Sequence, residues 1–139
     1  VFNHHLGESG VTFCAERKTA MLLKRGFPKS LNNAPALLPA DTTSLRRSLE
    51  KWFQAAGIRP HVVADFEDAA LMKVVAAEGK GFVAIPTIVA AEATARYGLH
   101  VIGSTDRCHD NVYAITAERR ISHPAVTLIT ESARELFAQ

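Results

Sequence analysis

The sequence has few of the residues from which disulfide frameworks and metal clusters are built. Two cysteines occur among 139 residues, Cys14 and Cys108, and no C-x-x-C spacing is present. Two distant thiols argue against a disulfide framework, and we expect both to be reduced and structural. A nucleophilic cysteine would need a base beside it, and His109 adjoins Cys108 only along the chain.

An excess of charge of one sign is also missing. The 16 lysines and arginines against 14 carboxylates give a formal net charge of +2, and the basic residues are scattered along the chain. Domains that bind nucleic acid through their own surface usually carry a clustered basic stripe, so we expect no such footprint. No apolar run is long enough to span a membrane, and no basic leader with a cleavage site opens the chain. The expectation is a cytoplasmic protein with no membrane partner.

Motifs of the common enzyme classes are absent. Gly79-Lys80-Gly81 lacks the third glycine of a dinucleotide fingerprint and precedes a predicted strand instead of following one. No G-x-S-x-G elbow and no H-E-x-x-H pair occurs. The adjacent carboxylates Glu67 and Asp68 stand at a predicted helix start, where the helix dipole favours negative charge, so capping explains them better than acid–base catalysis. We expect no enzyme, no cofactor and no metal site.

What the sequence does contain is the composition of one ordinary globular domain, 47% apolar and 22% charged. Short apolar runs bounded by turn residues predict strands at residues 11–15, 35–39, 58–64, 81–85, 100–103 and 111–116. Helical spacing predicts helices at residues 45–56, 69–77, 87–97 and 124–137. Strands and helices alternate with short connections, which indicates an α/β fold with a parallel sheet flanked by helices.

The clearest helix begins after residues 41–43, whose side-chain oxygens can cap its start, and ends before Gly57. One face of it is apolar. The other face carries charged side chains, which we expect to be solvated rather than in contact with DNA: Arg46, Arg47, Glu50 and Lys51.

Three segments in a fixed order resemble the LysR-type transcriptional regulators. GVTFCA at residues 10–15 resembles the strand that leaves the first lobe of that family's effector domain, and APALLP at residues 34–39 resembles the opening of the second lobe. VVAAEGKGFVAIP at residues 74–86 is similar to the family's helix ending in V-A-A-G-x-G and the buried strand after it, with Glu78 inserted before the glycine. Within the family, NHHLGESGV at residues 3–11 and FEDAAL at residues 66–71 are similar to the NhaR-like activators, which are tied to sodium and proton antiport.

The resemblance implies a periplasmic-binding-protein-like (type II) effector domain, in which crossover strands join two α/β lobes. On that map residues 1–20 are the end of the first lobe and the outgoing hinge strand, and residues 21–108 are the second lobe. Residues 109–139 are the returning hinge strand and a C-terminal helix of the first lobe. The chain opens without methionine, so we expect a fragment that lacks most of the first lobe and the N-terminal domain through which the parent regulator binds DNA.

Ligands of open α/β sheets bind at the carboxyl ends of strands, near helix N-termini. Two junctions meet that description and match cleft-lining positions of the family, and the hinge strand adds one hydroxyl. We therefore expect a small-molecule or ion effector to contact these residues: Phe66, Glu67, Asp68, Ile85, Pro86, Thr87 and Thr12. Phe66 is equally well explained as a core residue. The two carboxylates would suit a cation such as sodium, if further oxygen ligands converge on them.

Partners follow from the same resemblance. Effector domains of the family pair, so we expect a homo-oligomer, either a dimer or a tetramer, in which the effector favours one lobe-closure angle and so biases the assembly. Without the first lobe, residues 11–15, residues 111–116 and the last helix should expose apolar surface. Two alternatives stay open, a free-standing solute-binding protein of the same fold and a small α/β enzyme.

Overall fold

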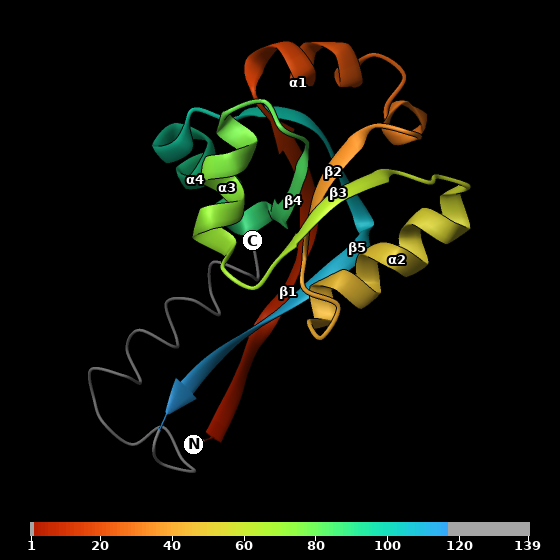
Figure 1. Ribbon diagram of the computed structural model, residues 1–139. Helices are drawn as coiled ribbons and strands as arrows, with labels where there is room; N and C mark the ends of the chain where they lie inside the picture. Colours follow the sequence, from red (N-terminus) through yellow and green to blue (C-terminus); the bar gives the residue numbers. More distant parts are fainter. Residues whose placement is uncertain (1, 117–139) are drawn as a thin grey trace.

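Strands and helices alternate along the chain in a computed structural model, which describes residues 2–116 (Figure 1). The elements are β1 (Phe2–Ala15), α1 (Arg17–Lys24), η1 (Lys29–Leu31), β2 (Pro35–Pro39), α2 (Ser44–Ala56), β3 (His61–Phe66), α3 (Ala69–Ala77), β4 (Val83–Pro86), η2 (Thr87–Val89), α4 (Ala90–Tyr97) and β5 (His100–Thr116). None of the helices in this part of the chain is long and apolar enough to cross a membrane.

The strands form one continuous surface in the order β3, β2, β4, β1, β5. β2 and β3 pair in parallel, and a parallel bridge from Ala36 to Phe82 joins them to the segment that enters β4. β1 pairs antiparallel with β4 on one side and with β5 on the other. β2, β3, β4 and β5 therefore run in one direction and β1 runs against them. The predicted parallel sheet flanked by helices is confirmed, with the hinge strand β1 inserted antiparallel.

Both ends of α2 are capped by the residues that the sequence predicted. Thr43 precedes the helix with an extended backbone, and its hydroxyl accepts a hydrogen bond from the Arg46 amide at 3.2 Å. Gly57 follows with a φ of 70°, the left-handed conformation that glycine adopts without steric cost. Trp52 and Phe53 are buried on its inner face.

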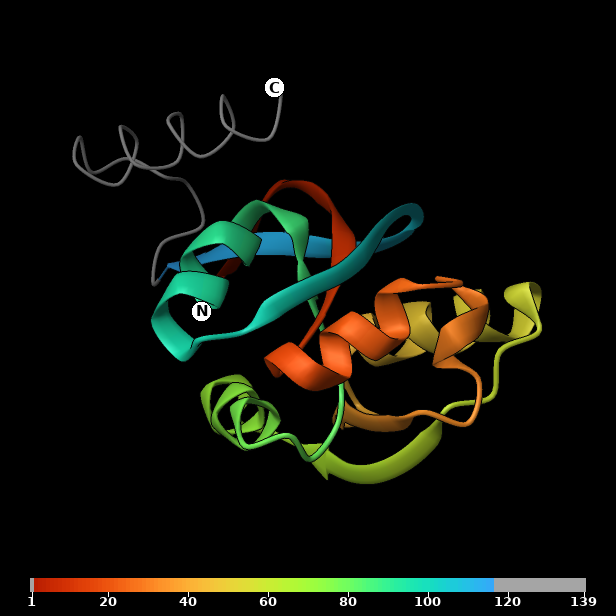
Figure 2. The same ribbon diagram turned by 90° about the horizontal axis from the view of Figure 1, so that it is seen from above.

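The core lies on both faces of the sheet because successive side chains of a strand point to opposite sides. Phe13 of β1 packs under α1 and α2, where its ring stacks on Trp52 at 5.2 Å between centroids. Its neighbour Cys14 points to the other face, into the cluster under α3 and α4. Viewed from above, the helices cover both sides of the strands in this way (Figure 2).

The hinge strands differ from the prediction in length and in burial. β1 begins at Phe2 instead of residue 11, and the two strands predicted at residues 100–103 and 111–116 are one long strand, β5. Residues 11–15 are buried at the centre of the sheet, so the apolar exposure predicted for them is wrong. These residues are shielded because β4 and β5 flank β1 in the sheet and helices cover both of its faces.

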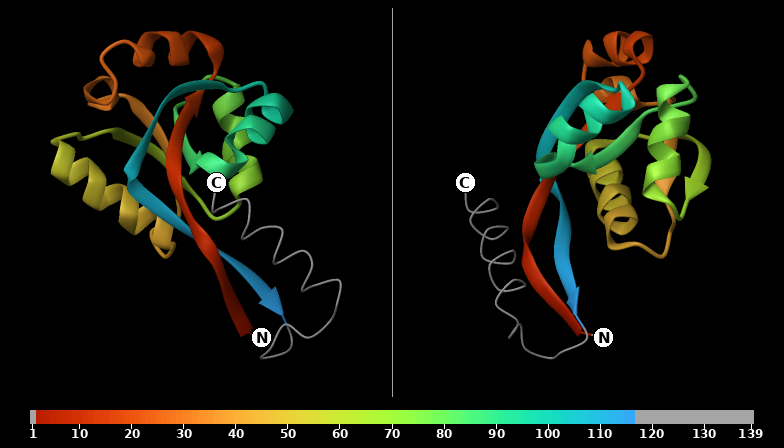
Figure 3. Two further views of the ribbon diagram at one scale, coloured as in Figure 1. Left: turned by 180° about the vertical axis from the view of Figure 1, so that it is seen from behind. Right: turned by 90° about the vertical axis from the view of Figure 1, so that its left-hand side faces the viewer.

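The outer halves of β1 and β5 instead form a ribbon that projects from the sheet (Figure 3). Phe2, Tyr113 and Ile115 are exposed on this ribbon, as predicted for residues 111–116. α1 was not predicted, because only a short apolar run marks it in the sequence. The predicted helix at residues 124–137 lies outside the described residues.

Candidate functional site

Three strands end on the same side of the sheet, and we call this side, formed by the carboxyl ends of the parallel strands, the carboxyl edge. Pro39 closes β2, Phe66 closes β3 and Pro86 closes β4, and each is followed by the start of a helical segment. β1 enters the sheet at the same edge because it runs in the opposite direction. This is the place where open α/β sheets bind ligands.

Four hydroxyls, which we call the hydroxyl cluster, lie where β1 enters: Ser9, Thr12, Thr87 and Ser104. Thr12 Oγ1 lies 2.9 Å from Thr87 Oγ1 and 2.7 Å from Ser104 Oγ, so one buried hydroxyl joins β1 to β5 and to the start of η2. The Ile88 amide donates to Ser9 Oγ at 3.2 Å. Thr12 is 2% exposed and Ser9 is 6% exposed, while Thr87 and Ser104 reach solvent. Thr87 and Ser104 are therefore accessible to a ligand, whereas Thr12 and Ser9, which hold them in place, are buried.

Strand register brings these residues together. Thr12 pairs with Ile85 on one side and with Ser104 on the other. Thr87 comes directly after Pro86, at the start of η2. The sequence predicted Thr12 and Thr87 as site residues, and the structure places them in contact. Ile85 was also predicted, but its side chain is 1% exposed and packs in the core under α3 and α4, so only its backbone lies near the site.

A cavity of about 210 Å³, the edge cavity, opens at the ends of β2 and β3. Phe66 and Glu67 line it beside Asp110 of β5. Burial raises the pKa of the Asp110 carboxyl above its ordinary value. The remaining lining residues, none of them basic, are Pro39, Thr43, Ser44, Leu45, Ala69 and Met72.

Asp68 is the N-cap residue of α3. Its Oδ1 accepts hydrogen bonds from the amides of Ala70 at 2.9 Å and Leu71 at 3.2 Å, which caps α3 as the sequence indicated. Within residues 2–116, no three His, Cys, Asp or Glu side chains are grouped so that they could hold a metal ion. Asp68 and Glu67 therefore do not form a cation site by themselves.

Sequence reasoning missed Ser9, Ser104 and Asp110. Ser104 and Asp110 belong to β5, and they reach the site only because that strand pairs with β1 across about ninety residues of chain. No local pattern reveals such a pairing. Ser9 was missed because Ser9-Gly10 is a typical turn sequence, whereas in the structure both residues belong to β1.

The pairing of β1 with β5 breaks beside the site. Val11 pairs with Thr105 and Ser9 with Asp110, so residues 106–109 bulge out of β5 opposite Gly10. Cys108 of this bulge is buried and lies 3.4 Å from Ser48 Oγ of α2. The bulge thus anchors β5 to α2.

Both thiols are free and buried, as predicted. Burial raises the pKa of the Cys14 thiol to about 11 and raises that of Cys108 as well. A protonated, buried thiol is neither a nucleophile nor a metal ligand at neutral pH.

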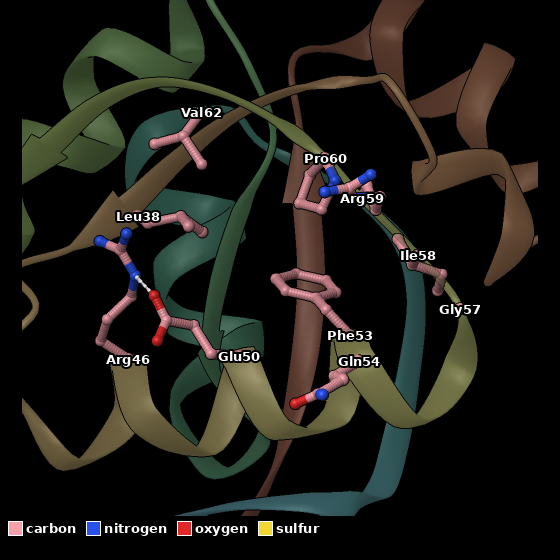
Figure 4. A pocket seen from close by; sticks show the side chains of 10 residues that line it. All are labelled: Leu38, Arg46, Glu50, Phe53, Gln54, Gly57, Ile58, Arg59, Pro60 and Val62. Atoms are coloured by element: carbon pink, nitrogen blue, oxygen red, sulfur yellow. Dashed lines mark hydrogen bonds and ion pairs between the residues drawn. The ribbon is translucent and has the colours of Figure 1, made fainter.

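A second hollow, of about 490 Å³, lies between α2 and the edge strand β3 (Figure 4). Its floor is apolar, with Leu38, Phe53 and Ile58, and Arg46 stands at its rim. The expectation that Arg46 is solvated is wrong: its side chain is 11% exposed. It donates to Glu50 at 2.9 Å, to Asp65 at 2.6 Å and to the Pro39 carbonyl at 2.9 Å. Arg46 therefore clamps α2 to the ends of β2 and β3.

Comparisons with known proteins agree with this fold. A family model described as the LysR substrate binding domain matches residues 3–138. The chain is 33% identical over 129 residues to the transcriptional activator protein NhaR of Escherichia coli K12, and equally to that of Shigella flexneri. These alignments cover 93% of this chain, which spans 42% of the length of those relatives.

Two solved structures of low sequence identity share the fold. The effector domain of AmpR from Pseudomonas aeruginosa has a TM-score of 0.67 at 19% identity, covering 98% of this chain and 65% of that one. The regulatory domain of CcmR from Synechocystis, in complex with 2-PG, has a TM-score of 0.67 at 14% identity, covering 98% of this chain and 66% of that one. The chain belongs to the LysR family of transcriptional regulators, within its substrate-binding domain.

Proposed function

We propose that this chain is the larger part of the effector-sensing domain of a cytoplasmic, NhaR-like transcriptional activator that contacts DNA through a part of the protein outside this sequence. Residues 21–108 form its second lobe, residues 1–20 carry the outgoing hinge strand, and residues 109–139 carry the returning strand and a helix of the first lobe. The projecting ribbon supports this division, because its paired strands leave the sheet together beside the carboxyl edge. The chain performs no catalysis in this proposal.

The effector binds at the carboxyl edge, between the hydroxyl cluster and the edge cavity. The single observation that carries this proposal is the contact of Thr12 with Thr87 and Ser104, because it joins the hinge strands to the ligand-binding edge through one buried hydroxyl. Phe66 supplies an apolar wall. An effector that hydrogen-bonds to Thr87 or Ser104 acts directly on the hinge, and so on lobe closure.

A thermal-shift screen of the chain tests this proposal, because a ligand that binds only the folded state raises its melting temperature. The probes are Na⁺, Li⁺, phosphate and shikimate, the last because QuiR, a protein of similar fold, is solved with it. A probe that raises the melting temperature should lose its effect in Thr87→Val and Phe66→Ala but keep it in Leu22→Ala, which lies on the exposed side of α1. A shift that survives both edge variants would place the effector elsewhere.

The narrower part of the proposal is that the effector is a cation, sodium in particular. Glu67 and Asp110 line the edge cavity, and no basic side chain of the described residues lines it with them. Replacing Glu67 and Asp110 by alanine and asparagine should abolish a Na⁺-dependent shift, whereas Asp68→Ala should lower stability without changing the Na⁺ response, because Asp68 caps α3. A sodium response that persists without both cavity carboxylates contradicts this part alone.

The hollow between α2 and β3 is where we place the homodimer contact. β3 is an edge strand of the sheet, and its Val62, 40% exposed, lines the hollow beside the apolar floor. An open edge with exposed apolar side chains is a ready template for a second chain. Light scattering should show a dimer or tetramer, and Val62→Lys should shift it towards monomer. A wild-type monomer at high concentration would contradict the assignment.

A further inference from the structure

Basic side chains lie together at one end of the sheet, where residues 17–25, in α1 and at its end, carry four of them and the fold adds Lys80. β2, β3, β4 and β5 begin at this end, and the antiparallel β1 ends there. α1 and the connections before these strands therefore lie together, at the top of the molecule in Figure 1. Hydrogen bonds join the connections: the Arg59 amide donates to Asn32 Oδ1 at 2.9 Å, and the Asn33 amide donates to the Arg59 carbonyl at 2.9 Å.

Five exposed cations form what we call the basic face: Arg17, Lys18, Lys24, Arg25 and Lys80. Lys29 and Arg59 belong to the same end of the sheet. None of the five is in an ion pair with a carboxylate of residues 2–116. Two carboxylates of the described residues lie at this end, Glu78 and Glu16, and Glu16 caps α1 by accepting the amides of Lys18 and Thr19. The five cations of the basic face outnumber them, so this end carries an excess of positive charge.

The low net charge of the chain hides this face because the opposite end is acidic. Side chains at or near the carboxyl edge include Glu8, Asp41, Asp65, Glu67, Asp68 and Asp106, which outnumber the cations there, Arg46, Arg47 and Arg107. Two clusters of opposite sign cancel in the sum but not in space, and each creates its own local potential. The structure thus places five exposed cations at one end of the molecule, which the net charge of the chain does not reveal.

We propose that the basic face binds the phosphate backbone of duplex DNA. Exposed, unpaired lysines and arginines gain free energy on phosphates by releasing condensed counterions. α1 has 8 residues and so is about 12 Å long, enough to lie along neighbouring phosphates of one strand. The inference rests on the proposed function in one respect: a regulator that holds DNA elsewhere presents it to this face at high effective concentration.

Fluorescence anisotropy of a labelled duplex of about 30 base pairs, titrated with the 139-residue chain over a range of salt concentrations, tests the proposal. The test variant is the pair Lys18→Glu and Arg25→Glu. The matched control is the pair Arg47→Glu and Lys51→Glu on the exposed side of α2, which changes the net charge equally. Wild type and control should bind with affinity that falls steeply with salt. The basic-face variant should bind about tenfold more weakly at low salt, with a salt slope shallower by about 2.

Three results would overturn the proposal: no binding at the lowest salt concentration, equal losses in the two charge-reversal pairs, or a greater loss on replacing the exposed apolar pair Met21 and Leu22 by serine. The last would show that apolar contacts of this pair, 66% and 77% exposed, and not the cations, carry the binding. Thermal melts of every variant verify folding. The thermal-shift screen for effectors contains no DNA, so failure of this proposal is distinguishable from failure of the proposed function.

Discussion

Replacing Thr12 by valine removes one hydroxyl and keeps the shape of the side chain. Thr12 is 2% exposed, and its hydroxyl contacts Thr87 Oγ1 at 2.9 Å and Ser104 Oγ at 2.7 Å. Each neutral hydrogen bond contributes about 1 kcal/mol net. Thr87 and Ser104 are exposed, so water can replace the lost partner and no buried group is left unsatisfied. We therefore expect a loss of about 1–2 kcal/mol in the free energy of unfolding.

Urea denaturation followed by circular dichroism measures this change, with an unaltered m-value as the sign that only stability has changed. Thr42→Val is the control, because Thr42 is exposed and lies before α2; it should change stability by less than about 0.5 kcal/mol. A double-mutant cycle with Thr87→Val should give a coupling energy of about 0.5 kcal/mol or more. If Thr12→Val costs nothing, or if the two changes are additive, the hydroxyl cluster does not join β1 to η2.

Three further outcomes follow from the described contacts. Arg46→Met should lower the free energy of unfolding in urea by about 1–3 kcal/mol, because it removes the hydrogen bonds to Asp65 and to the Pro39 carbonyl. The control Arg96→Met breaks an exposed ion pair with Glu92 and should lower it by less than about 0.5 kcal/mol. Equal losses in the two variants would contradict the role of Arg46 in holding α2 to the ends of β2 and β3. Cys14 should not react with a thiol reagent at pH 8 until the chain is unfolded, since burial holds its pKa near 11. Burial raises the pKa of Asp110, so its ionisation opposes folding as the pH rises above about 4; Asp110→Asn should therefore gain stability over the wild type at pH 7 but not at pH 3.5, and the reverse trend would refute the burial.

Local signals were sufficient to predict most elements between residues 35 and 97. Proline brackets β2, Thr43 and Gly57 bound α2, and Asp68 caps α3, all as the sequence indicated, because each depends on residues within a few positions. α1 escaped prediction because its cap is Glu16, a residue type uncommon at that position, and because only a short apolar run marks it.

The candidate site also combines residues that the local sequence predicts with residues that it does not. Phe66 and Thr87 were predictable because they follow strands that the sequence shows. Ser104 and Asp110 were not, since their place depends on the register of β5 against β1 and on the bulge at residues 106–109. Burial of residues 11–15 was also unpredictable, because it depends on both neighbouring strands.

Binding of the effector at the carboxyl edge is the central claim, and amide chemical shifts test it most directly. The ¹⁵N-labelled chain is titrated with whichever of Na⁺, Li⁺, phosphate or shikimate gives the largest thermal shift. We expect the largest changes at the amides of Thr12, Phe66, Thr87 and Asp110. Changes concentrated instead around Phe53 in the hollow between α2 and β3 would contradict it.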